Sequence, residues 1–278
     1  MARASSIKPA KVRPAAVAGR FYPADPAELR RVIESFLSLV QPDNAVAPKA
    51  IIAPHAGYIY SGPIAASAYA RFASARPVIQ RVVLIGPSHF VPFEGLAASS
   101  AEAFATPIGL VPVDTDAVRQ ICALPQVIVL DEAHAREHAL EVQLPFLQVV
   151  LGDFRIVPLV VNEAGDEAVA RVIDALWGGP ETRFVISSDL SHYHAYSSAQ
   201  ELDSVTRRAI EELRPQDIEE EQACGRIPIR GLLRAARQHH LRARAVDLRN
   251  SGDTAGPRSQ VVGYGAFVFE GDQQGSVK

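Results

Sequence analysis

The sequence predicts an α/β fold: one domain in which a mostly parallel central sheet of six or more strands is flanked by helices on both faces. Three observations lead to this prediction. Continuous apolar runs of strand length, such as "RVVLIGP" at 81–87, are typical of strands buried on both faces. Amphipathic helical patterns alternate with these runs along the chain. The length of 278 residues is sufficient for one large α/β core.

The first helical pattern, at 25–40, carries clear start signals. Asp25 is the expected N-cap and Glu28 is placed to complete a capping box. In the pattern at 136–151, Pro145 predicts that the helix bends or restarts. The expected strands are, in order, 16–23, 49–54, 81–87, 127–131, 154–161, 183–189 and 260–270, and the expected helices are 25–40, 61–72, 115–124, 136–151, 165–178, 197–213 and 227–240.

Composition limits the domain organisation and the classes of partner. We expect a flexible N-terminal arm at 1–11, a single domain at 12–270 and a C-terminal tail at 271–278. A net charge of −3 gives no electrostatic basis for binding nucleic acid. No apolar run reaches the roughly 18–20 residues that a membrane span needs. The chain has only two cysteines and needs no disulfide at this size, so we expect a cytoplasmic protein with free thiols.

Chemically active residues follow three of the expected buried strands. His55 comes after one strand, His89 after the next, and Asp189 and His192 follow a third. In open α/β sheets, ligands bind outside the carboxyl ends of the strands. If these strands are neighbours, the side chains converge on one cleft and can bind a metal. The alternative for each residue is an ordinary hydrogen-bonding role at the surface.

Two further segments add candidates. In "EHALEVQLPF", His138 and Glu141 are three residues apart, so on a helix they would share a face. Such a pair can supply a metal ligand, a residue that orients a ligand, or a general acid–base; a solvated helix start is the alternative. Cys224 precedes the expected helix at 227–240, where the helix dipole would stabilise a thiolate suited to a soft metal.

Five segments carry a family resemblance. They are "APHAGYIYSGPIAASAY", "LIGPSHFVPFEG", "EHALEVQLPFLQ", "VISSDLSHY" and "ACGRIPI". Together, and in this order, they resemble the MEMO family, over roughly 12–270. That family is structurally similar to class III extradiol ring-cleaving dioxygenases, which use non-haem iron(II), so the resemblance implies their α/β fold. Prokaryotic members are often called AmmeMemoRadiSam system protein B, which implies radical-SAM and AMMECR-type partner proteins.

The resemblance also implies roles for individual residues. His55, His89 and Cys224 match the positions that bind metal in the family. His192 matches the histidine that corresponds to the dioxygenase acid–base, with Asp189 and His138 as its neighbours. A working dioxygenase holds iron with two histidines and one carboxylate. A thiolate as the third ligand shifts the preference towards copper or zinc, and puts ring cleavage in doubt.

Three functional hypotheses follow. The leading one is a MEMO-like metal-binding protein with a dioxygenase-like cleft, holding iron or copper, or alternatively zinc, and acting as a redox enzyme on an unassigned substrate. The second is a non-catalytic module whose cleft binds a peptide or protein, with a vestigial site. The third is an extradiol aromatic-ring dioxygenase. In each case the cleft takes a small-molecule or peptide ligand, and not nucleic acid.

Overall fold

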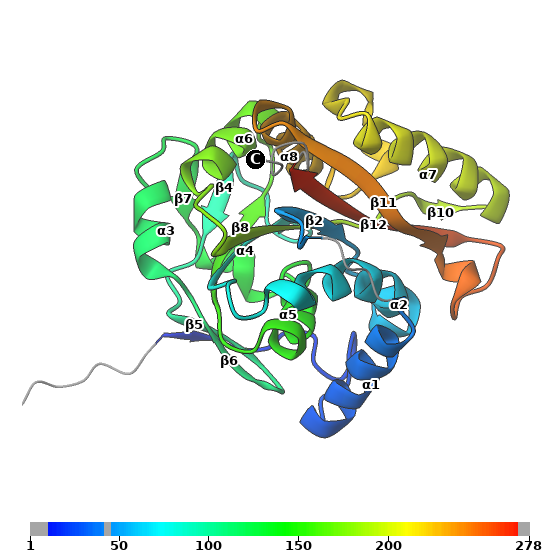
Figure 1. Ribbon diagram of the computed structural model, residues 1–278, viewed down its shortest axis with the longest axis horizontal. Helices are drawn as coiled ribbons and strands as arrows, with labels where there is room; N and C mark the ends of the chain where they lie inside the picture. Colours follow the sequence, from blue (N-terminus) through cyan, green and yellow to red (C-terminus); the bar gives the residue numbers. More distant parts are fainter. Residues whose placement is uncertain (1–10, 42–45, 272–278) are drawn as a thin grey trace, which may run out of the picture.

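The centre of the molecule is a nine-stranded mixed sheet (Figure 1). The computed structural model describes residues 11–41 and 46–271. The strand order is β10-β12-β2-β9-β3-β8-β4-β7, and β11 also pairs with β12. The strands of this sheet are β2 (Ala50–Ala53), β3 (Arg81–Pro87), β4 (Leu96–Ala98), β7 (Val127–Val129), β8 (Arg155–Val161), β9 (Thr182–Ser187), β10 (His192–His194), β11 (Leu241–Asn250) and β12 (Val261–Gly271).

The parallel part of the sheet is its middle. Strands β2, β9, β3 and β8 are adjacent and parallel, and they are the continuous apolar runs of the sequence. Antiparallel pairs flank this part: β12 is antiparallel to β2, β10 and β11, and β4 is antiparallel to β8, although β7 at the outer edge is parallel to β4. For β11 and β12 the connection accounts for the antiparallel pairing, because it is shorter than the crossover of a dozen or more residues that a parallel pair requires. The α/β fold is confirmed, with a mixed rather than mostly parallel sheet.

Helices cover both faces of the sheet (Figure 1). One layer consists of α1, α2 and α5, which pack on one another, with α2 against β2, β11 and β12. The other layer consists of α6, α7 and α8, with α8 against β3 and β9 and α7 against β11 and β12. The helices are α1 (Pro26–Ser38), α2 (Tyr58–Tyr69), α3 (Thr115–Ile121), α4 (Asp131–Ala135), α5 (Leu144–Leu151), α6 (Asp166–Ala175), α7 (Tyr196–Glu211) and α8 (Arg226–Gln238).

The shorter elements complete the fold. A second sheet, of order β1-β5-β6, contains β1 (Val12–Arg13), β5 (Ala103–Thr106) and β6 (Gly109–Pro112). The 3-10 helices are η1 (Ala70–Ala75), η2 (Glu141–Gln143), η3 (Pro215–Asp217), η4 (Glu220–Gln222) and η5 (Ser251–Asp253).

Within the described part of the chain, no helix has the length and apolar character needed to cross a membrane. Apart from residues 11 and 271, the expected terminal arm and tail lie outside the described residues.

Local predictions for the N-terminal part had mixed outcomes. Helix α1 begins as expected, because Asp25 accepts a hydrogen bond from the backbone N–H of Glu28 at 2.8 Å. The strand expected at 16–23 is wrong. Gly19 adopts a φ of +77°, and its N–H donates to the Tyr22 carbonyl at 2.8 Å. The segment therefore folds into turns, with one isolated bridge between Ala18 and Tyr22.

The helix expected at 136–151 is also shorter than predicted. Residues 137–140 are irregular, and regular helix begins only at α5, with Pro145 in its first turn. Proline is favoured in the first turn of a helix, so the restart near Pro145 is confirmed. Because His138 lies in the irregular part, it does not share a helical face with Glu141, and that prediction is wrong.

His134 in α4 is a buried histidine outside the candidate site. Its Nε2 lies 3.0 Å from the carbonyl of Ala97, so Nε2 must carry the proton, because a carbonyl only accepts. Nδ1 is buried and has no hydrogen-bond partner among the described residues. Burial lowers the pKa of His134 to about 4, although the hydrogen bond to Ala97 opposes the shift. The neutral imidazole is therefore the form that fits the fold.

This arrangement predicts acid destabilisation. The folded pKa of His134 is depressed below its ordinary value, so its contribution is complete above about pH 6.5 and is lost as pH falls towards about 4. We expect a loss of about 3 kcal/mol in the free energy of unfolding from this residue between pH 7.5 and 4.5. His134→Gln keeps a donor for Ala97 and cannot titrate, so urea unfolding should show a flatter pH profile. An unchanged profile would exclude His134 as the cause.

Candidate metal centre

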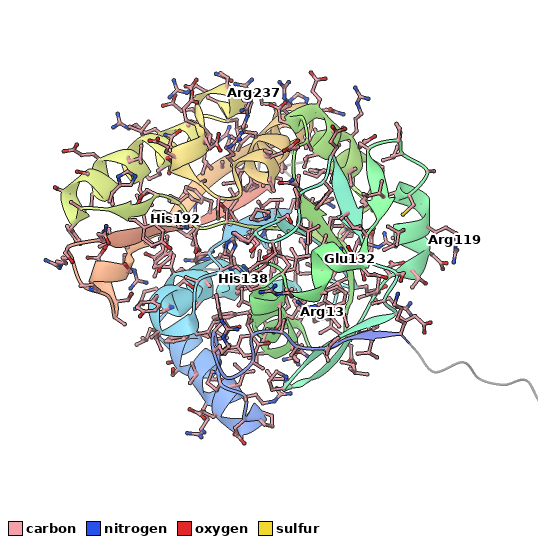
Figure 2. All side chains as sticks on the ribbon, turned by 180° about the vertical axis from the view of Figure 1, so that it is seen from behind. Arg13, Arg119, Glu132, His138, His192 and Arg237 are labelled. Carbon is pink, nitrogen blue, oxygen red and sulfur yellow. The ribbon has the colours of Figure 1, made fainter. Side chains whose placement is uncertain are left out.

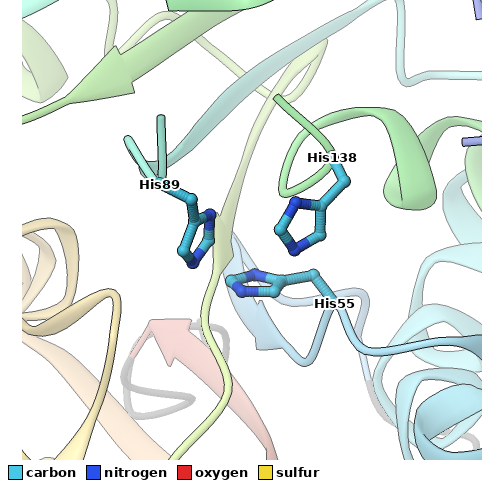
Figure 3. Close-up of side chains that lie close together, drawn as sticks. All are labelled: His55, His89 and His138. Carbon is cyan, nitrogen blue, oxygen red and sulfur yellow. The ribbon is translucent and has the colours of Figure 1, made fainter. Parts of the chain in front are cut away.

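The parallel strands bring three candidate segments to one edge of the sheet. Strand β9 lies between β2 and β3, and all three run in the same direction. His55 follows β2, His89 follows β3, and Asp189 follows β9, so the three residues emerge next to one another. His138 joins them from the irregular segment between α4 and η2. Figure 3 shows the imidazoles of His55, His89 and His138 facing one another. We call these three residues the histidine cluster.

The geometry of the histidine cluster suits a metal ion. One ring nitrogen from each of His55, His89 and His138 lies within 4.8 Å of the others. The ring centroids of His89 and His138 are 4.6 Å apart, and the ring of His55 stands at 5.2 Å and 5.4 Å from theirs. His55 is buried, whereas His89 is exposed, so the cluster is anchored in the protein and open on one side. Three imidazoles of this kind can hold a metal ion.

Glu137 orients His89. Its Oε1 lies 2.9 Å from Nδ1 of His89, and its Oε2 accepts the backbone N–H of the same residue at 2.7 Å. A carboxylate only accepts, so Nδ1 of His89 carries the proton and Nε2 keeps a free lone pair. Burial alone would raise the pKa of Glu137, but the hydrogen bonds from His89 and from the Ala139 N–H outweigh it and hold the pKa at about 2.

Ser187 fixes the tautomer of His55 in a similar way. The hydroxyl of Ser187 donates to the Ala139 carbonyl at 2.6 Å and accepts from Gln143 at 2.8 Å. Its single proton is used, so Nδ1 of His55, 2.9 Å away, must be the donor, which leaves Nε2 unprotonated. Burial, and then the neighbouring His89, lower the pKa of His55 well below its ordinary value. Burial likewise lowers the pKa of His138, to about 4. Both residues are therefore neutral near pH 7, as metal ligands must be.

Cys224 lies directly beside the cluster. Its Sγ is 3.3 Å from Nε2 of His55 and 3.7 Å from the Asp189 carbonyl. The thiolate that the sequence predicts at this helix start is opposed by burial. Burial, and then the charge of Asp189, raise the pKa of Cys224 to about 12. The thiol is therefore protonated at neutral pH, and only a bound cation would favour the thiolate.

Asp189 and His192 line the same cleft as the histidine cluster. Oδ1 of Asp189 accepts the backbone N–H groups of His55 at 2.7 Å and Ala56 at 3.3 Å, so the carboxylate braces the loop after β2. Burial raises the pKa of Asp189, with opposing contributions from these hydrogen bonds and from His192. His192 stands on β10, and Figure 2 shows it on a different segment from His138.

These residues open into a cleft of about 550 Å³. Such a volume is in the range of small-molecule sites. The histidine cluster, Asp189 and His192 form part of its lining, whereas Cys224 does not. The other lining residues come mainly from the N-terminal segment, the start of α2 and the β11–β12 connection: Phe21, Ala56, Gly57, Tyr60, Tyr193, Ser251, Gly256, Pro257, Gln260, Val262 and Tyr264.

A buried ion pair fixes the segment that carries Glu137 and His138, and the sequence analysis missed it. The guanidinium of Arg13 donates to the carbonyls of His134 and Glu137, at 3.0 Å and 2.6 Å, and pairs with the carboxylate of Glu141. Glu141 is fully buried and also accepts the N–H groups of Ala16 and Val17. Its oxygens are occupied, so Glu141 belongs to this structural ion pair and is not available to the cluster.

Glu137 is the second residue that the sequence analysis missed, and its role predicts a measurable effect. Glu137→Gln replaces one accepting oxygen with an amide donor, so either the N–H or Nδ1 of His89 loses its partner. We expect affinity for zinc to fall by about 10–100-fold. Competition titration with a chromogenic chelator measures this. Glu132→Gln, at an exposed position in α4, is the matched control. Equal affinities for both variants would remove Glu137 from the site.

The fold and the site together define an α/β protein with a histidine cluster at the carboxyl edge of its sheet. A family model described as Memo-like protein matches residues 13–268. The chain belongs to this Memo-like family, which confirms the resemblance found in the sequence.

Similar proteins agree over nearly the whole chain. A MEMO1 family protein of Aquifex aeolicus is 36% identical over 270 residues, covering 93% of this chain and 99% of that one. One from Aeropyrum pernix is 39% identical over 281 residues, covering 92% and 99%. Among solved structures, an uncharacterized protein, JW3007, from Escherichia coli K12 aligns with a TM-score of 0.49 and 14% identity, over 77% of this chain and 98% of that chain. That similarity is too distant to transfer a function.

Proposed function

We propose that this chain is a metal-dependent protein with a dioxygenase-like cleft, in which His55 and His89 hold an iron or copper ion, with zinc as the alternative. The observation that carries the proposal is that hydrogen bonds fix both imidazoles in the tautomer that can bind a metal ion. Their Nδ1 atoms are engaged by Ser187 and Glu137, so both Nε2 atoms carry a lone pair that can bind a metal ion. Nε2 of His55 already contacts Sγ of Cys224, the flanking sulfur donor. Imidazole suits iron, copper and zinc alike.

Two donors flank this pair. His138 lines the cleft beside the pair, and Cys224 lies next to His55 but is not part of the cleft lining. The 3.3 Å between Sγ of Cys224 and Nε2 of His55 is close to the separation, roughly 3.6 Å, of two such ligands on one tetrahedral ion. Cys224 as the third ligand and His138 as a neighbour of the acid–base residue fit the family resemblance. The alternative, with His138 as the third ligand and Cys224 as a neighbour, fits the short distances within the histidine cluster.

The bound ion would supply Lewis-acid or redox chemistry in the cleft, at the histidine cluster. The chain itself supplies the proton transfer. His192 lines the same cleft and is only partly buried, so it can exchange a proton with a ligand and with solvent. Asp189 holds the backbone of His55 in place, and His192 acts electrostatically on its carboxyl group. We assign His192 as the acid–base residue and Asp189 as its electrostatic partner.

Metal analysis of protein purified anaerobically tests the proposal, followed by an oxygen-uptake screen. The proposal predicts about one iron or copper ion per chain, bound through histidine. Stoichiometric metal with rapid cleavage of a catechol panel would instead support an extradiol dioxygenase. A purified chain that neither contains nor binds metal, but holds a stable peptide or protein partner, would support the binding-module alternative and contradict the proposal.

A further inference from the structure

Tyr193 has a backbone conformation that its residue type disfavours. Its φ is +61°, in the left-handed region, where a Cβ atom crowds the backbone. Glycine or asparagine adopts this conformation more readily. In the part of the chain that the structure describes, the only other non-glycine residues with positive φ are Leu213 and His240. A tyrosine at such a position needs a compensating role for its side chain.

That role is not packing within the fold. Tyr193 is 70% exposed, and its ring makes an edge contact with the ring of His192, with the centroids 5.8 Å apart. Burial of the ring therefore contributes little to offset the backbone strain. Backbone strain that packing does not offset is typical of functional positions.

The strained backbone also shapes the site. His192 pairs with Val262 and His194 pairs with Val261, so Tyr193 is an additional residue in β10, opposite consecutive residues of β12. A bulge of this kind re-aims the side chains around it. Here both His192 and Tyr193 line the cleft. The same distortion thus brings the proposed acid–base residue and an exposed aromatic ring to one cavity.

The surroundings of Tyr193 indicate what it contacts. Phe21, Tyr60 and Tyr264 also line the cleft. Burial and then the charge of Asp189 raise the pKa of Tyr264, and Tyr60 and Tyr193 lie close enough to add to this shift. No lysine or arginine is among the described residues of the lining, and Asp189 is its only carboxylate. The cleft therefore lacks the cationic clamp that a carboxylate or phosphate tail would require away from the histidines.

We propose that Tyr193 is a specificity-determining residue, which holds an uncharged, flat apolar group of the ligand in the cleft while the ligand's polar end meets the metal. The inference rests on the proposed function, because the ligand is anchored at the histidine cluster. It goes beyond that function by naming the residue that selects the ligand and the chemical character of the selected part. Aromatic side chains favour such groups through stacking and apolar burial.

The test uses cobalt(II)-loaded protein and two probes, imidazole and 4-phenylimidazole. Both bind a metal through nitrogen, and only the second carries a phenyl ring. Binding is followed by the visible absorption of cobalt(II). We expect the parent protein to bind 4-phenylimidazole at least about tenfold more tightly than imidazole. Tyr193→Asn should abolish most of this preference, leave imidazole affinity unchanged, and keep or raise the melting temperature because the strain is relieved.

Two control variants sharpen the test. Tyr193→Phe keeps the ring and should keep the preference. His240→Asn changes an exposed residue of similar φ, +53°, that is not part of the cleft lining, so it should keep the preference as well. If Tyr193→Asn keeps the full preference, or loses stability together with imidazole affinity, the inference is overturned while the metal site stands. If cobalt(II) does not bind at all, the proposed function fails, and this inference fails with it.

Discussion

Glu141→Gln should lower the free energy of unfolding by about 3–5 kcal/mol, because it leaves the buried guanidinium of Arg13 without its counter-charge. The side chains of Arg13 and Glu141 are 5% and 0% exposed, so solvent cannot replace the lost partner. The substitution also replaces one accepting oxygen with an amide donor: either Oε2, which accepts from Ala16, or Oε1, which accepts from Val17 and Tyr22. Urea unfolding followed by circular dichroism measures the loss.

A surface pair provides the control for this prediction. Asp116 and Arg119 form an ion pair at 2.8 Å with side chains 86% and 75% exposed, so Asp116→Asn should change stability by less than about 1 kcal/mol. The double variant Arg13→Met/Glu141→Leu removes both charges and should recover part of the loss. If Glu141→Gln and Asp116→Asn are equally mild, the buried pair does not stabilise the fold as described.

His55→Ala should lower the affinity for metal by more than about 100-fold, because it removes a ligand rather than a residue that only orients one. The fold should survive, since the histidine cluster lies beyond the strand ends and not within the sheet. Affinity is measured by competition titration, with circular dichroism as the folding control. His240→Asn serves as the matched histidine variant, because His240 is exposed, follows the C-cap of α8 and is not part of the cleft lining.

The flanking donors can be distinguished in the same assay. Cys224→Ser keeps the size of the side chain but offers a harder and weaker donor, and should cost at least about 10–100-fold in affinity for copper(I) or iron(II) if sulfur is a ligand. His138→Ala should produce the larger loss if the third ligand is an imidazole. A His55→Ala protein that binds as tightly as the parent would contradict the proposed site altogether.

The convergence of His55 and His89 could be predicted from sequence because it follows from topology. Each residue comes directly after a continuous apolar run, and parallel strands place their carboxyl ends at one edge. His138 could not be placed in the same way. It lies in an irregular segment whose path depends on Arg13, a residue far away in sequence that shows no local pattern.

Strand β11 was not predicted for a related reason. Arginines 242, 244 and 249 interrupt its apolar residues, which is typical of an exposed segment, and only pairing with β12 makes it a strand. This pairing is one of the antiparallel pairs that make the sheet mixed. The continuous apolar strands of the parallel part and most of the long helices, in contrast, depend on local periodicity and could be predicted within a few residues.

X-ray absorption spectroscopy of the zinc-loaded protein is the most direct test that His55 and His89 hold one metal ion. We predict one ion per chain with at least two imidazole ligands, at a zinc–nitrogen distance of about 2.0–2.1 Å, and an added shell at about 2.3 Å if Cys224 binds. The imidazole signal should fall by one ligand in His55→Ala and again in the His55→Ala/His89→Ala double variant. A shell of oxygen atoms alone, unchanged by either variant, would contradict the account.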